Sequence, residues 1–162
     1  MVARTECDLV QDITTDCSVV ASLCAVMRHL NSNKKHSVSA RSLTSQKTNS
    51  WQLTTPKLLP TLLYPFDYDK GRPVASQNGK YMFRLNFNGC FRQVVVDDRL
   101  PASKTSRTFF VVDRRNPELI WPALMEKAYL KIRGGYDFPG SNSGTDLWVL
   151  TGWIPEQIFL QR

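Results

Sequence analysis

Cys17 and Gln11 are the residues whose types and spacing are best suited to chemistry. Cys17 follows Asp16, a residue type that often caps helices, and precedes apolar residues that recur at helical spacing. We therefore expect Cys17 in the first turn of a helix, where unpaired backbone amides and the helix dipole stabilise a thiolate. Gln11 lies six residues earlier, and its side chain and the Cys17 backbone amide could both donate hydrogen bonds to an oxyanion. The pattern favours a cysteine nucleophile with Gln11 in its oxyanion hole.

Four stretches of the chain together resemble the calpain family of cysteine proteases, whose catalytic core has a papain-like fold. The family's nucleophile segment is Gln-Gly-x-x-Gly-Asp-Cys-Trp followed by a small, apolar helix, and Gln11, Asp16, Cys17 and Ala21 match it. Three further stretches follow in the family's order, at residues 94–101, 121–136 and 150–152. The resemblance covers essentially the whole chain, but it corresponds to only the first half of a calpain core.

The resemblance implies a domain organisation and an activity. Residues 1–162 would form a single domain, the Cys-bearing N-terminal subdomain of the catalytic core. The family's catalytic His and Asn belong to a second subdomain that is not in this sequence, so this half would be inactive alone. The implied function is limited proteolysis of protein substrates by an intracellular endopeptidase, with Cys17 as nucleophile and Gln11 as oxyanion donor.

Departures from the family pattern bear on calcium. Ser18 replaces the Trp after the nucleophile, and Asp12 and Thr15 stand where glycines are usual. Animal-type calpains bind calcium through an acidic residue three positions before the oxyanion Gln, which Asp8 fits, and a second one that falls near Trp148 here. An indole cannot ligate a cation that requires oxygen. We therefore expect no calcium switch, no metal and no other cofactor.

This divergence is more similar to the fungal PalB-type branch of calpain-like proteases. Those proteins act in ambient-pH signalling, where they process a zinc-finger transcription factor, so the resemblance implies a role of that kind. The chain shows no amphipathic anchor of its own. A recruiter associated with endosomal membranes would therefore act on regions outside it.

Neither histidine of the chain is suited to be the general base for Cys17. His29 lies 12 positions later on the same expected helix, which places it roughly 18 Å away at about 1.5 Å per residue. His36 follows a polar stretch beyond the helix, where a solvated side chain is the default. Because a base must come within hydrogen-bond reach of the thiol, we expect this chain to lack one.

Composition agrees with one folded domain in a reducing compartment. The chain has 162 residues, of which 42% are hydrophobic and 10% aromatic, enough for a real core. The four cysteines show no paired spacing; we expect Cys24 and Cys90 to be small buried side chains, and Cys7 is ambiguous. Residues 19–27 are apolar but too few to span a bilayer, and they follow acidic residues, so we expect a cytoplasmic protein.

The elements that must position these residues indicate an α+β fold. Asn88-Gly89 joins two strand-like stretches, 81–87 and 90–96, in the strongest hairpin signal of the chain. A third strand is expected at residues 109–112. A second helix is expected from a cap at Asn116 to Gly134-Gly135. Its core face would comprise Trp121, Leu124, Ala128 and Ile132.

Residues 134–151 are rich in Gly, Ser, Asn and Thr, and we expect them to form a loop. Within it, Tyr136 and Trp148 could face a substrate cleft or cover the core, and the sequence favours neither.

Two pairs of charged neighbours have simpler interpretations than catalysis. Asp97-Asp98 precedes Arg99 and a Leu-Pro exit from a strand, which indicates a turn held by charge-assisted hydrogen bonds. Glu126 and Lys127 are adjacent on the second expected helix and do not face each other, so we expect them on a solvated face.

Two other functions remain open. The formal net charge of +7 and an isoelectric point near 9.4 are compatible with a basic module that binds nucleic acid or an acidic protein. Basic residues are spread along the chain and mixed with acids, which disfavours a nucleic-acid partner. A noncatalytic pseudoprotease scaffold is the second alternative, because Ser18 replaces Trp and a general base is missing.

Overall fold

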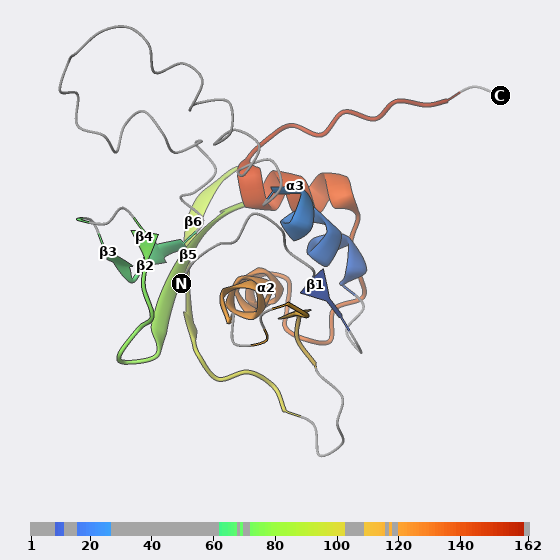
Figure 1. Ribbon diagram of the computed structural model, residues 1–162. Helices are drawn as coiled ribbons and strands as arrows, with labels where there is room; N and C mark the ends of the chain where they lie inside the picture. The colour runs from blue at the N-terminus through green and yellow to red at the C-terminus, as the bar shows by residue number, and fades with distance from the viewer. Residues whose placement is uncertain are drawn as a thin grey trace, which may run out of the picture.

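The computed structural model describes residues 9–11, 16–26, 62–67, 69, 72–102, 109–115, 117 and 120–160. Its helices are one over residues 17–26, α2 (Trp121–Ile132) and α3 (Ser143–Thr151) (Figure 1). Its strands are β1 (Leu9–Val10), β2 (Leu62–Tyr64), β3 (Phe66–Asp67), β4 (Arg72–Pro73), β5 (Lys80–Phe87), β6 (Cys90–Asp97) and β7 (Val112–Asp113). Several residues that the sequence singles out lie outside the described part: Cys7, Asp8, Asp12, Thr15, His29, His36 and Asn116.

The β5–β6 hairpin is confirmed. Asn88 and Gly89 both have positive φ, 51° and 79°, which is the backbone that a tight hairpin turn needs. The strands pair antiparallel from Phe87 opposite Cys90 to Lys80 opposite Asp97, and β2 joins the other edge of β5. Alternate residues of β5 are buried, so one face of the hairpin is directed to the core.

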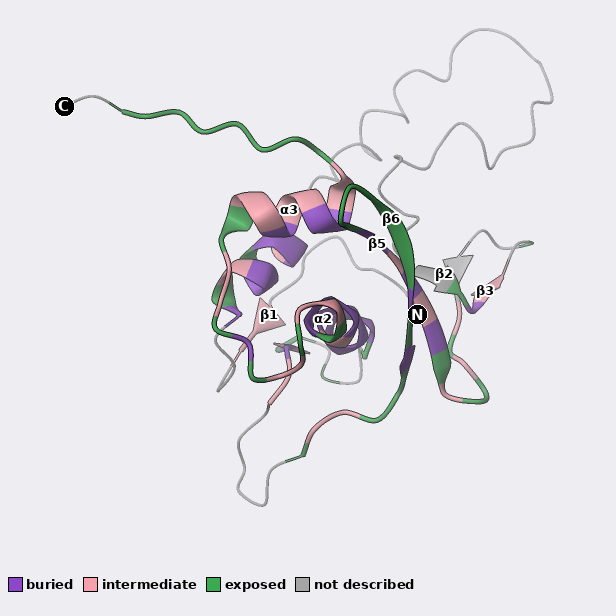
Figure 2. Cartoon of the chain, turned by 180° about the vertical axis from the view of Figure 1, so that it is seen from behind, coloured by how far each residue is buried: buried purple, intermediate pink, exposed green. Residues whose placement is uncertain are grey.

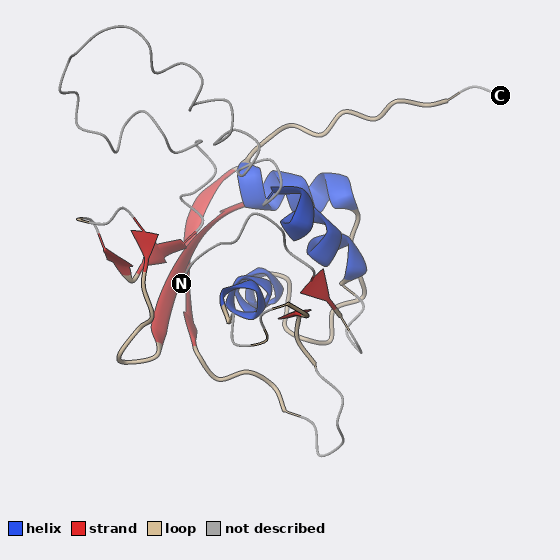
Figure 3. Ribbon diagram, viewed as in Figure 1, coloured by secondary structure: helices blue, strands red, loops and turns tan. Residues whose placement is uncertain are grey.

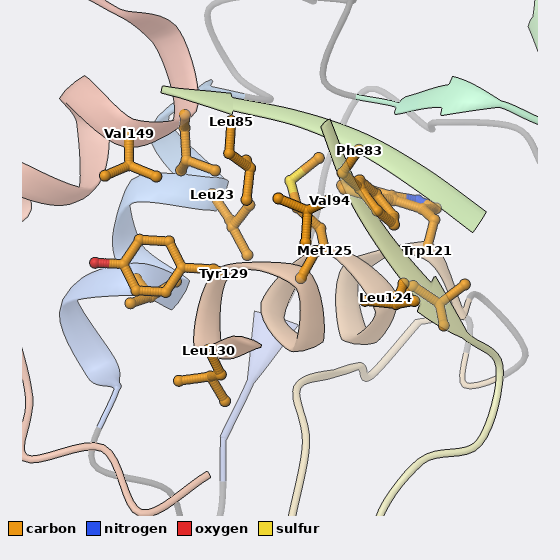
Figure 4. Packing of buried hydrophobic residues seen from close by; sticks show 14 of the residues in the cluster. Leu23, Phe83, Leu85, Val94, Trp121, Leu124, Met125, Tyr129, Leu130 and Val149 are labelled. Carbon is orange, nitrogen blue, oxygen red and sulfur yellow. The ribbon is translucent and has the colours of Figure 1, made fainter. Parts of the chain in front are cut away.

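The core lies between that face and the helices. Figure 1 shows α2 end on, with the hairpin on one side and the helix over residues 17–26 on the other. In Figure 2 much of β5 is coloured as buried or intermediate, whereas most of β6 is coloured as exposed. In Figure 4, Leu23, Phe83 and Leu124 come from three different elements and meet in one cluster. These helices and antiparallel strands (Figure 3) confirm the α+β class.

The predicted core face of α2 is confirmed, but its predicted start is wrong. Trp121, Leu124 and Ala128 are buried, and Ile132 packs against the same cluster. The helix begins only at Trp121, with Ile120 at its N-cap and Pro in its first turn.

The predicted loop at residues 134–151 is also wrong, because its second half forms α3. Asn142 caps this helix by accepting a hydrogen bond from the Thr145 backbone N–H at 3.0 Å, and Gly152 ends it with a φ of 76°. α3 could not be predicted from the sequence, because its first turn contains Ser143 and Gly144, which are weak helix formers.

The predicted third strand is shorter than expected and shifted. β7 contains only Val112 and Asp113, which pair with Val10 and Leu9 of β1 in a separate antiparallel sheet. Val111 precedes β7, and its backbone N–H donates to the side chain of Glu126 at 2.8 Å. The small β1–β7 sheet holds the chain immediately before Gln11.

Candidate active site

The helix that starts at Cys17 is formed as the sequence predicts. The Asp16 carbonyl accepts hydrogen bonds from the backbone N–H groups of Val19 at 2.8 Å and Val20 at 3.1 Å, so the first turn begins there. Cys17 is a free cysteine and its side chain is exposed. A thiol at this position meets both the unpaired amides of the helix start and the solvent from which a substrate would approach.

Gln11 is brought to the same place by a side-chain contact. It directly follows β1, and its amide nitrogen Nε2 donates a hydrogen bond to the carboxylate oxygen Oδ1 of Asp16. Asp16 immediately precedes Cys17 and is 0% exposed. The Gln11 amide therefore contacts the residue that immediately precedes Cys17 in the chain. The bond also sets the orientation of the Gln11 side-chain amide, with the nitrogen Nε2 directed at Asp16.

Glu126 completes this cluster, and the sequence interpretation of it is wrong. It is 0% exposed rather than solvated. Its oxygen Oε2 accepts the hydrogen bond from the Val111 backbone N–H, and its carboxyl lies against that of Asp16. Burial, and then the bond to Asp16 and its negative charge, raise the pKa of Glu126 to about 9. Glu126 is thus a neutral carboxylic acid at neutral pH.

A signal for the burial of Glu126 was present in the sequence. The stretch from Trp121 to Leu130 has apolar residues on every side of the helix, and such a helix is buried all round. An acidic residue inside it has to find a polar partner within the protein. The partner itself could not be inferred, because Asp16 lies 110 positions earlier in the chain.

The turn at Asp97 is held as expected, although by a different cation. Asp97 Oδ1 accepts from the Arg99 backbone N–H at 2.9 Å and from Lys127 Nζ at 2.6 Å. Lys127 Nζ also donates to the Arg99 carbonyl. The bond to Lys127 has the larger effect, and together the two bonds hold the pKa of Asp97 below its usual range. Lys127 therefore ties α2 to the end of β6.

Comparison with known proteins assigns the chain to a family. The family model described as calpain family cysteine protease matches residues 2–162. The chain belongs to the calpain family of cysteine proteases. It is 60% identical over 161 residues to the calpain-like protease palB/cpr-8 of Neurospora crassa, covering 99% of this chain and 15% of that protein. The calpain-like protease palB/RIM13 of Aspergillus oryzae is 58% identical, over 96% of this chain. Human calpain-7 is 40% identical over 91% of this chain. The chain spans about 15% of the length of these relatives.

Two aromatic residues of this calpain-family chain, Tyr136 and Trp148, lie against its core. Tyr136 and Trp148 are half-buried and pack on the main hydrophobic cluster, which favours the core interpretation of the two that the sequence left open. Tyr136 also lines an open pocket of about 510 Å³ between the hairpin and the C-terminal part of α2. Neither Gln11 nor Cys17 lines that pocket, so it is separate from the candidate active site.

The other cysteines differ from expectation. Cys90 is exposed at the start of β6 rather than buried, because it sits next to the hairpin turn, and Cys24 is half-buried. No three His, Cys, Asp or Glu residues come together as metal ligands within the described part of the chain. The absence of a calcium switch stays a prediction. In the same part, no helix is both long and apolar enough to cross a membrane.

Proposed function

We propose that this chain is the nucleophile-bearing half of a calpain-like cysteine endopeptidase. The observation that supports this most directly is the exposed Cys17 thiol at a helix start, next to a buried carboxylate that holds the Gln11 amide. Membership of the calpain family supports a protease, and protein substrates with it.

The proposed reaction follows from those two residues and an external base. Cys17 sulfur attacks the scissile carbonyl carbon, and the C=O electrons move to the oxygen, where Gln11 Nε2 and the Cys17 backbone N–H stabilise the oxyanion. The thiol proton passes to a His and then to the leaving amine as the C–N bond breaks. Water hydrolyses the resulting thioester, which returns the thiol and releases a carboxylic acid.

The base and its orienting Asn would come from a second catalytic subdomain, with residues 1–162 as the Cys-bearing domain. The distance from His29 to Cys17 expected along one helix supports a base from elsewhere. On this proposal, residues 1–162 alone turn over no peptide substrate.

The biological role that we propose is intracellular processing of a transcription factor in ambient-pH signalling, without calcium activation. Its support is the high identity to proteins named calpain-like protease palB in several fungi. A cytoplasmic location and an endosomal-membrane recruiter that acts on other regions belong to the same proposal.

Cleavage of a protein substrate by the full-length polypeptide that contains this chain tests the proposal. Cys17→Ser should abolish turnover, and Cys90→Ser, which alters another exposed cysteine, should leave it unchanged. Gln11→Ala should lower the rate by about 10² to 10³ if its amide binds the oxyanion. Unchanged turnover in Cys17→Ser, with folding intact, would remove the nucleophile assignment.

A noncatalytic scaffold is the second candidate, because Ser18 replaces the Trp of the family pattern. It predicts a full-length protein that folds and binds partners but forms no covalent adduct at Cys17. A basic binding module has less support, since Lys127 and Lys131 are both engaged within the chain, with Asp97 and the Val95 carbonyl.

A further inference from the structure

Asp16 and Glu126 form a pair of fully buried carboxyl groups beside the candidate nucleophile, and the proposed reaction gives neither of them a role. Both side chains are 0% exposed. Neither Asp16 Oδ2 nor Glu126 Oε1 receives a hydrogen bond from an N–H or hydroxyl group in the described residues. Two carboxylates in contact and out of water repel each other, so one shared proton is the arrangement that satisfies both oxygens.

The proton belongs on Glu126, because the bonds of the two groups differ. Asp16 Oδ1 already accepts a hydrogen bond from the Gln11 amide. Glu126 Oε2 accepts from a neutral backbone N–H, and its other oxygen is left to carry the proton toward Asp16. Glu126 thus acts as a donor on one side and an acceptor on the other.

The two contacts of Glu126 reach both ends of the segment that joins Gln11 to Cys17. One contact is with Asp16, at the start of the nucleophile helix. The other is with Val111, whose neighbour Val112 pairs with Val10, the residue before Gln11. α2 is anchored in the main core through Leu124 and Ala128, so it offers a fixed point for both.

We propose that Glu126 is a positioning residue for the active site: its carboxyl group donates to Asp16, accepts from Val111, and thereby fixes Gln11 and Cys17 relative to each other. It touches neither the substrate nor the sulfur. This inference rests on the proposed function, because it assigns Glu126 a role only if Cys17 and Gln11 act together.

The groups around Glu126 define how this arrangement responds to pH. Asp16 faces it from the start of the nucleophile helix, and Val111 contributes a backbone N–H. Tyr136, in the segment after α2, lies near enough for Glu126 to raise its pKa. Tyr136 remains neutral beyond neutral pH, since burial raises its pKa. The group that changes charge first on the alkaline side is therefore Glu126 itself, and its ionisation places two negative charges in contact.

Kinetics of the full-length polypeptide test this proposal with three variants. Glu126→Gln keeps one donor and one acceptor, so kcat near pH 7 should stay close to the wild-type value. Glu126→Leu removes the acceptor of the Val111 N–H and the carboxyl beside Asp16 Oδ2, and kcat should fall by about 10²-fold with little change in KM. The control is Asp146→Leu, which removes another fully buried carboxyl, bonded to Tyr129 on α2; it should lower stability but not kcat per folded molecule.

The ratio of the kcat of Glu126→Gln to that of the wild type is measured as a function of pH. A purely structural role of Glu126 would leave this ratio independent of pH. The ratio should rise as the pH passes about 9, because only the wild type ionises there. A flat ratio, a Gln variant as poor as Leu, or a Leu variant with the kcat of Asp146→Leu would each overturn the proposal. If Glu126→Leu does not fold, the Gln ratio still decides. The variant Cys17→Ser separates this inference from the proposed function. Activity that persists in Cys17→Ser would refute the proposed function. If Cys17→Ser is inactive but Glu126→Leu keeps full activity, only the present inference is refuted.

Discussion

Asp16 is the residue on which the local geometry of the site depends. Its carbonyl starts the nucleophile helix, one carboxylate oxygen binds the Gln11 amide, and the carboxyl also meets Glu126. The sequence predicted the position of Asp16 at the helix start and the proximity of Gln11 and Cys17. It did not predict Glu126, because a partner so distant along the chain leaves no mark in local spacing or periodicity.

The buried acid should give the chain an unusual dependence of stability on pH. The folded-state pKa of Glu126 is about 9, against an ordinary value of 4.5. Between these values the folded chain holds a proton that the unfolded chain has released, so raising the pH favours unfolding. We expect the free energy of unfolding to decrease over this interval in the wild type, more steeply than in Glu126→Gln.

Urea titrations of both proteins at a series of pH values would measure this difference. Because other groups titrate equally in the two proteins, subtracting the curves isolates Glu126. Parallel curves between pH 5 and 9 would mean that Glu126 is ionised in the folded protein, contrary to its burial beside Asp16.

At the scale of elements, the hairpin could be predicted from sequence and α3 could not. Asn88-Gly89 specifies a tight turn between β5 and β6 by local chemistry alone. α3 has a glycine in its first turn, and its caps and its packing against β5 help to stabilise it as a helix. The start of α2 was misplaced for a related reason, because Asn116-Pro117 resembles a helix start but precedes the helix itself.

Removal of the α3 cap should therefore be costly. Asn142→Ala deletes the acceptor for the Thr145 N–H and should lower the free energy of unfolding by about 1 kcal/mol. Asn142→Asp retains an acceptor there and is the matched control, with stability near that of the wild type. Denaturant unfolding measures both, and equal stability of Ala and Asp variants would show that the cap does not stabilise α3.

On the scale of the whole molecule, α2 connects the parts that the candidate active site needs. Glu126 contacts Asp16 at the start of the nucleophile helix and Val111 just before β7. Lys127 holds the end of β6, and Tyr129 contacts Asp146 of α3. Residues 153–160 extend away from this body (Figure 1), with exposed apolar side chains at Ile154, Phe159 and Leu160. The helix that starts at Cys17 packs on α2 through Val19 and Leu23, so the candidate nucleophile lies on an element of the core.

The central claim, that Cys17 is the nucleophile of a calpain-family protease, is tested most directly by a peptide-based electrophile that mimics an acyl substrate. After reaction with the full-length protein, mass spectrometry would locate the adduct, with Cys90 as an internal control that is also exposed. We predict rapid modification of Cys17, little at Cys90, and loss of the Cys17 adduct in Gln11→Ala. Equal labelling of Cys17 and Cys90, at the rate of an ordinary surface thiol, would contradict the account.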